Sequence, residues 1–158
     1  MKRPQPLDTY AQARNGHQPT YTVAELFCGC GGFSHGFKRS GRFRVVLGND
    51  IKKQALATFA LNHTENVTPP AVIAEDIRTV PARAIVAHLQ AQGVQELDCL
   101  IGGPPCQGFS QMKRAEERKG NAIVTFRGYD TLSHDPRNDL ALRLLEVAQV
   151  LHPRIIVV

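Results

Sequence analysis

The chain has 158 residues, of which 42% are hydrophobic and 21% are charged, a composition typical of a globular domain with a sizeable core. No stretch approaches the roughly 18 consecutive apolar residues of a membrane span, and no secretory signal follows the polar N-terminus, so we expect a cytoplasmic protein with no membrane partner. The net charge of +5 favours an anionic partner, but many soluble proteins are mildly basic.

Strand-like apolar runs alternate with helical patterns along most of the chain. Residues 1–19 are polar and show no apolar period, so they predict a flexible tail. Beyond the tail we predict strands at 21–27, 45–49, 71–74, 97–101 and 155–158, and helices at 33–40, 52–62, 81–92 and 139–151. Such alternation implies right-handed crossovers and a sheet covered on both faces. The predicted fold is α/β, a Rossmann-like doubly wound parallel sheet.

The residues that follow each strand are the informative ones, because ligands of such sheets bind beyond the carboxyl ends of the strands. A glycine-rich turn follows the first strand, with the residues Phe27, Cys28, Gly29, Cys30, Gly31 and Gly32. The small side chains let backbone N–H groups approach a nucleotide-like ligand, although a tight structural connection is an equal alternative. The spacing lacks the third glycine of the dinucleotide fingerprint, which disfavours a nicotinamide-dependent oxidoreductase.

Two carboxylates stand at the ends of adjacent strands beside this turn. Asp50 follows the second strand, and its two oxygens suit the hydroxyls of a ribose. Asp76 follows the third strand, where it could accept a hydrogen bond from the exocyclic amine of adenine. Either acid could instead cap the helix that follows it.

The fourth strand leads to a cysteine whose surroundings are typical of a nucleophile. Cys106 follows two prolines and precedes glutamine and glycine, which fix its direction without making a core around it. A cysteine that packs as a small hydrophobe fits Cys99 instead. Cys28 and Cys30 have no further histidine or cysteine partners nearby, so we predict no metal site.

Together these residues resemble the DNA cytosine carbon-5 methyltransferase family. Residues 25–37 resemble its first motif, and residues 104–110, Pro-Pro-Cys-Gln-Gly-Phe-Ser, resemble its catalytic motif. Residues 49–55, 76–77 and 135–140 resemble its ribose, adenine and fifth motifs, in the same order along the chain. Glu25 stands where the family usually has Asp, and Asp50 where it usually has Glu, so both positions keep their charge.

The resemblance implies S-adenosyl-L-methionine as the cofactor and double-stranded DNA as a partner. The implied cofactor-binding residues are Phe27, Cys28, Gly29, Cys30, Gly31, Gly32, Asp50, Ile51, Asp76, Ile77, Pro105 and Leu140. The thiolate of Cys106 would add to carbon 6 of a cytosine flipped out of the duplex, which activates carbon 5 for methylation. Residues 110–134, which carry an excess of basic side chains, would form the mobile loop that closes behind the base, although a solvated linker is an equal alternative.

Residues 20–158 would then form a partial methyltransferase domain, incomplete at its C-terminus. The family's Glu-Asn-Val segment after the last strand, its target-recognition domain and its closing C-terminal helix are absent from the sequence, so we expect the isolated chain to be inactive. The chain could be a piece of a longer enzyme, one half of a split enzyme completed by a second chain, or a non-catalytic relic that binds S-adenosylmethionine or DNA. The intact surroundings of Cys106 disfavour the relic.

Overall fold

The computed structural model describes residues 21–64, 68–105 and 139–158, together with the backbone of 116–119 and 122–125. The predicted tail at 1–19 lies outside the described residues. So do Cys106 and most of the predicted loop at 110–134.

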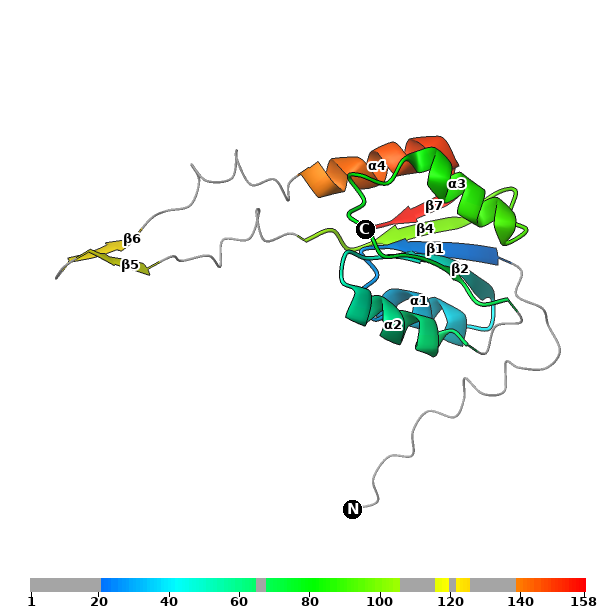
Figure 1. The fold of residues 1–158 in the computed structure, drawn as a ribbon, viewed down its shortest axis with the longest axis horizontal. Helices are drawn as coiled ribbons and strands as arrows, with labels where there is room; N and C mark the ends of the chain where they lie inside the picture. The colour runs from blue at the N-terminus through cyan, green and yellow to red at the C-terminus, as the bar shows by residue number, and fades with distance from the viewer. Residues whose placement is uncertain (1–20, 65–67, 106–115, 120–121, 126–138) are drawn as a thin grey trace, which may run out of the picture.

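Five parallel strands form the central sheet, and helices connect them (Figure 1). The elements are β1 (Tyr21–Leu26), α1 (Gly32–Arg39), β2 (Phe43–Asn49), α2 (Lys53–Asn62), β3 (Ala71–Ile73), α3 (Ala82–Ala91), β4 (Cys99–Gly102), α4 (Asp139–Leu151) and β7 (Ile155–Val157). The strand order is β3-β2-β1-β4-β7, and every neighbouring pair is parallel. The predicted doubly wound α/β fold is confirmed, because the chain winds outward from β1 to β3 and then returns to the other side through β4.

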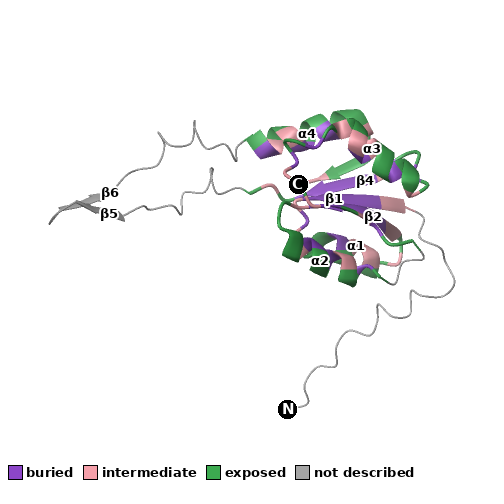
Figure 2. Cartoon of the chain, viewed as in Figure 1, coloured by how far each residue is buried: buried purple, intermediate pink, exposed green. Residues whose placement is uncertain are grey.

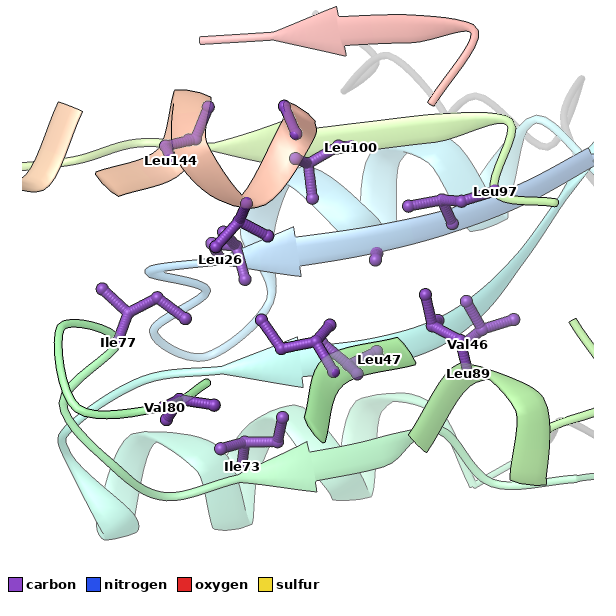
Figure 3. Packing of buried hydrophobic residues seen from close by; sticks show 14 of the residues in the cluster. Leu26, Val46, Leu47, Ile73, Ile77, Val80, Leu89, Leu97, Leu100 and Leu144 are labelled. Atoms are coloured by element: carbon purple, nitrogen blue, oxygen red, sulfur yellow. The ribbon is translucent and has the colours of Figure 1, made fainter. Parts of the chain in front are cut away.

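Helices cover both faces of the sheet, α3 and α4 on one and α1 and α2 on the other (Figure 1). The buried residues of β1 and β4 divide between two separate cores, so that Leu26 of β1 packs toward α3 and α4 while Val23 packs toward α1 and α2. Figure 3 shows the first core, in which Leu26 and Leu100 lie beneath Leu144 of α4. The middle strands β1 and β4 are accordingly buried (Figure 2).

Two strand glycines bring the helices close to the sheet. A Cβ atom added to Gly48 of β2 would collide with the ring of Phe59, and one added to Gly102 of β4 would collide with Leu144. The helices α2 and α4 therefore fill space that these glycines leave open.

At the amino ends of β1 and β4, Thr22 and Asp98 form a reciprocal clasp. The backbone N–H and the hydroxyl of Thr22 donate to one carboxylate oxygen of Asp98 at 2.8 and 3.0 Å, and the N–H of Asp98 donates to the Thr22 hydroxyl at 3.1 Å. Arg154, just before β7, lies 3.4 Å from the other oxygen of Asp98. One carboxylate thus links the starts of three neighbouring strands.

A short antiparallel hairpin occurs within the segment that the sequence predicts to be a loop. Its strands are β5 (Glu116–Lys119) and β6 (Ala122–Thr125), with Glu116 opposite Thr125. The sequence did not predict these strands, because Glu116–Lys119 contains only charged residues and the apolar run at Ala122–Thr125 is too short to indicate a strand.

The edge strand β7 differs from the others because its side chains are largely exposed. Ile155 and Ile156 are exposed, as is Val158 directly after the strand, although β7 pairs with β4 along its whole length. Among the helices of the described ranges, none is both long enough and apolar enough to cross a bilayer.

Candidate cofactor-binding and active site

The glycine-rich turn lies at the carboxyl end of β1, between the ends of β2 and β4. The backbone is left-handed at Phe27, Gly29 and Gly31, with φ values of 55°, 53° and 87°. The N–H of Cys28 donates to the carbonyl of Asn49 at 2.9 Å, which ties the turn to the end of β2. A Cβ atom added to Gly31 would lie 2.8 Å from Phe59, whereas one added to Gly29 would meet no atom within 4 Å. Packing against Phe59 thus requires a glycine at position 31, whereas Gly29 borders open space.

Asp50 contacts the turn directly. One of its carboxylate oxygens accepts the backbone N–H of Gly29 at 2.8 Å, and the other accepts the N–H of Lys52 at 2.8 Å, just before α2. The helix-capping alternative is wrong for Asp50, because the N-cap residue of α2 is Lys52 and no side chain makes a capping hydrogen bond there. Asp50 instead closes a turn just before the helix. Each oxygen retains capacity for one further donor.

Asp76 follows β3 at the same edge of the sheet, and its carboxylate binds Arg78. The backbone N–H of Arg78 donates to one oxygen at 3.0 Å, its Nε–H is shared between both oxygens at 3.0 Å, and its Nη2 donates to the other oxygen at 2.5 Å. These hydrogen bonds lower the pKa of Asp76. Asp76 caps a turn and not a helix, because α3 begins only at Ala82.

The apolar residues predicted to contact a cofactor divide into exposed and buried ones. Ile51 is 62% exposed, next to Asp50, and Pro105 is also exposed, just past the end of β4. Ile77 and Leu140 are buried in the core beneath α3 and α4. Figure 3 shows Ile77 on the same side of the sheet as Leu26. Ile51 and Pro105 are therefore accessible to a ligand in this structure, whereas Ile77 and Leu140 support the site from within.

The two cysteines of the turn, Cys28 and Cys30, also differ in how far they are exposed. Cys28 is buried, and its burial, with smaller contributions from Glu25 and Asp50, raises the pKa of its thiol far above the usual range. Cys30 is exposed, and its carbonyl accepts a hydrogen bond from the Asn62 side chain at 2.9 Å. Neither is part of a group of three or more metal-binding side chains within the described residues.

Behind the turn lies a buried polar chain that the sequence did not reveal. Glu25 of β1 accepts the backbone N–H of Ser34 at 3.1 Å, and the Ser34 hydroxyl lies 3.0 Å from Nε2 of His63. Burial raises the pKa of Glu25, while its hydrogen bonds with Ser34 oppose the shift. Burial, followed by the charges of Lys38 and His35, lowers the pKa of His63 to about 4. In the sequence, the one sign of this buried polar chain was the acidic Glu25 inside an otherwise largely apolar strand.

Asn49 and Arg143 hold the strand ends together. The Asn49 side chain donates to the carbonyls of Ile73 and Glu75 at 3.0 and 2.9 Å, which links β2 to the loop after β3. Arg143 of α4 donates to the carbonyls of Ile77 and Val80 at 3.0 and 2.7 Å. Their partners are backbone atoms far away in sequence, so no residue pattern could have predicted these contacts.

A parallel sheet with a glycine turn after its first strand and acids after the next two defines a nucleotide-binding doubly wound domain. Residues 21–136 match the model of the C-5 cytosine-specific DNA methylases. The chain belongs to this family of S-adenosyl-L-methionine-dependent methyltransferases.

Three curated relatives illustrate the similarity. Type II methyltransferase M.AgeI of Thalassovita gelatinovora is 38% identical over 66% of this chain and 24% of its own length. Type II methyltransferase M.DdeI of Desulfomicrobium norvegicum is 33% identical over 85% of this chain and 26% of its own length. DNA (cytosine-5)-methyltransferase 1 of Mus musculus is 32% identical over 70% of this chain and 7% of its own length. The chain thus spans about a quarter or less of these relatives.

Proposed function

We propose that this chain binds S-adenosyl-L-methionine at the carboxyl edge of its sheet and carries the nucleophile of a DNA cytosine carbon-5 methyltransferase. The observation that carries the proposal is the arrangement of hydrogen bonds at Asp50. Each of its oxygens accepts one backbone N–H, from Gly29 or Lys52, and keeps one acceptor site free. Two adjacent ribose hydroxyls are donors that match such a carboxylate.

The surroundings of Asp50 fit the rest of this cofactor. The exposed side chain of Ile51 offers an apolar surface to the adenine ring. Side chains added at Gly29, Gly32 or Gly103 would meet no atom within 4 Å, which leaves room for a ligand beside the backbone. We assign the adenine amine to Asp76. When bound, the cofactor supplies an electrophilic methyl group.

Cys106 is the proposed nucleophile, although it lies outside the described residues. It directly follows Pro105 in sequence, and the assignment is supported by the pairing of β1 with β4, in which Leu26, just before the glycine turn, lies opposite Gly102. The thiolate would form a bond to carbon 6 of cytosine while the electron pair of the 5,6 double bond makes carbon 5 nucleophilic. Once carbon 5 has gained its methyl group, loss of the carbon 5 proton to a base and expulsion of the thiolate restore the ring.

Double-stranded DNA and a further polypeptide segment are the proposed partners. Carbon 6 is out of reach of a side chain while the base is stacked, so the cytosine must leave the duplex. The exposed Ile155 and Ile156 of the edge strand β7 support a segment that continues the sheet beside it. We propose that this segment, in the same or a second polypeptide, completes the enzyme and that the 158 residues alone methylate no DNA.

Trapping of the covalent adduct tests the nucleophile. The 158-residue chain is mixed with the remaining portion of M.DdeI as a separate polypeptide and with a duplex that carries 5-fluorocytosine at the target. Fluorine takes the place of the proton that carbon 5 must lose, so the adduct is trapped. A denaturation-resistant band with the combined mass of this chain and the DNA should appear, and it should vanish in Cys106→Ser. Normal methylation of unmodified DNA by an associated complex of the Cys106→Ser chain would refute the assignment. Methylation by the 158-residue chain alone would refute the need for a further segment.

A further inference from the structure

Both oxygens of the carboxylate assigned to adenine are already bound by the neighbouring Arg78. One oxygen of Asp76 accepts the backbone N–H and Nε of Arg78, both at 3.0 Å. The other oxygen accepts Nε at 3.0 Å and Nη2 at 2.5 Å. Nε carries a single hydrogen, which both oxygens share, so three N–H groups of Arg78 engage a carboxylate with about four acceptor sites. A further donor would have to compete with the Nε–H for the remaining site. Asp76 differs in this respect from Asp50, which keeps one free site on each oxygen.

The guanidinium group of Arg78 can leave this position without moving the loop that carries it. The side chain of Arg78 is 46% exposed, so water can replace the hydrogen bonds that it gives up. The loop itself is held by other residues, since Arg143 binds the carbonyls of Ile77 and Val80 and the N–H of Thr79 donates to the carbonyl of Asp76. Asp139, at the start of α4, is a second carboxylate whose charge acts on Arg78 and could receive it.

We propose that Arg78 is an internal competitor for the adenine site. Its guanidinium group binds the Asp76 carboxylate in the free protein and competes with the adenine amine for it when the cofactor binds. This inference rests on the proposed assignment of the adenine amine to Asp76. The competition lowers the affinity for every ligand that uses Asp76. It also gives selectivity, because a ligand without an amine at this position gains nothing by displacing the guanidinium group.

The size of the effect follows from the strength of an exposed ion pair. If Asp76 and Arg78 are paired for most of the time, only a minor fraction of the protein offers the amine an unpaired carboxylate. The apparent affinity for the cofactor is then reduced in proportion to that fraction. For an exposed bidentate pair, removal of the guanidinium group should tighten binding about three- to sixfold.

Calorimetric titration of the full chain with S-adenosylhomocysteine tests the competition. We expect Arg78→Met to bind S-adenosylhomocysteine about three- to sixfold more tightly than the original chain. Arg78→Lys should bind with intermediate affinity, because a single ammonium group replaces the guanidinium group that contacts both oxygens of Asp76. Arg83→Met, which changes an exposed arginine on α3, is the matched control and should leave the affinity unchanged. In the Asp76→Ala background, Arg78→Met should have no further effect.

S-inosylhomocysteine, which carries an oxygen in place of the amine, provides the second measurement. Its affinity should not increase in Arg78→Met. Weaker binding of S-adenosylhomocysteine by Arg78→Met would show instead that Arg78 positions Asp76, and this result would overturn the competition. An affinity that is unchanged in Asp76→Ala would overturn the adenine assignment itself, so the two failures are distinguishable. Absence of binding by the original chain and all of its variants would overturn the proposed cofactor site.

Discussion

The carboxylate of Asp50 accepts the backbone N–H of Gly29 at 2.8 Å, so the residue that we assign to the ribose also fixes the glycine turn. The left-handed backbone at Gly29 points this N–H toward the end of β2. Loss of the Asp50 carboxylate would therefore remove a ligand contact and loosen the neighbouring turn together.

Replacement of Asp50 should reduce cofactor binding strongly. We expect Asp50→Ala to weaken S-adenosylhomocysteine binding by about tenfold or more, because hydrogen bonds to a charged group contribute roughly 1.5–3 kcal/mol each. Asp50→Asn, which keeps one acceptor oxygen, should bind with intermediate affinity. Calorimetry gives the affinities, with Glu75→Ala at the neighbouring exposed position as the control. Unchanged affinity in Asp50→Ala would remove the ribose role.

The contact between β4 and α4 depends on the absence of a side chain at Gly102. An added methyl group would collide with Leu144, and it would lie 3.2 Å from the backbone carbonyl of Leu26. Gly102→Ala should therefore lower the free energy of unfolding by about 1–3 kcal/mol, the usual cost of overpacking. Gly103→Ala is the matched control, because its added methyl group meets no atom within 4 Å. Urea unfolding measures both; equal stabilities would contradict this account.

Much of the fold could be predicted from the sequence because its signals are local. Buried parallel strands are continuous apolar runs, and the helix at Asp139–Leu151 was predicted with the bounds that the structure has. Strand starts were less accurate, since β2 begins at Phe43 and not at 45, and β4 begins at Cys99 and not at 97. Arg44 interrupts the apolar run at the start of β2, and the buried Leu97 extends the apolar run beyond the start of β4.

The candidate site could be predicted only where the position of a residue in the sequence, relative to the strands and helices, indicates its role. Asp50 follows a strand and precedes a helix, and its place beside the glycine turn was expected from that position, although its hydrogen bond with the N–H of Gly29 was not. The pairing of Asp76 with Arg78 and the anchoring of a loop by Arg143 depend on rotamers and on backbone carbonyls. Neither feature leaves a periodic pattern, and both were missed.

Arg143 should stabilise the chain more than an ordinary surface arginine does. Its side chain is only 19% exposed, and it supplies donors to the carbonyls of Ile77 and Val80. Arg143→Met leaves both carbonyls without this donor, so we expect a loss of about 1–3 kcal/mol in the free energy of unfolding. Denaturant titration should detect the loss, while Arg83→Met should change stability by less than about 0.5 kcal/mol. A loss of equal size in both variants would contradict the anchoring role.

The buried His63 should make the chain less stable in mild acid. Its pKa is about 4 in the folded protein, against the ordinary value of 6.5, so between these two values the unfolded chain binds more protons than the folded one. Stability is then lost as the pH falls, by about 2 kcal/mol between pH 7 and pH 5. The raised pKa of Glu25 acts in the opposite direction, because that carboxyl binds its proton more readily in the folded state.

A comparison of variants isolates the contribution of the histidine. His63→Gln keeps a polar group near Ser34 but does not titrate, so its stability should fall less between pH 7 and pH 5 than that of the original chain. His88→Gln, on the exposed face of α3, is the control and should keep the original dependence. Urea unfolding at the two pH values provides the comparison. The explanation fails if His63→Gln loses as much stability as the original chain.

The clasp between Thr22 and Asp98 also bears on the rate of folding. The two residues are 76 positions apart in sequence, so the clasp can close only after β2, β3 and the intervening helices have been brought into a compact loop. Closing so long a loop costs conformational entropy before the contact stabilises anything, and parallel sheets built from such contacts fold slowly. If the clasp forms after the folding barrier, Thr22→Val will leave the refolding rate nearly unchanged and accelerate unfolding. The lifetime of the folded chain would then depend on one hydroxyl at the start of its central strand.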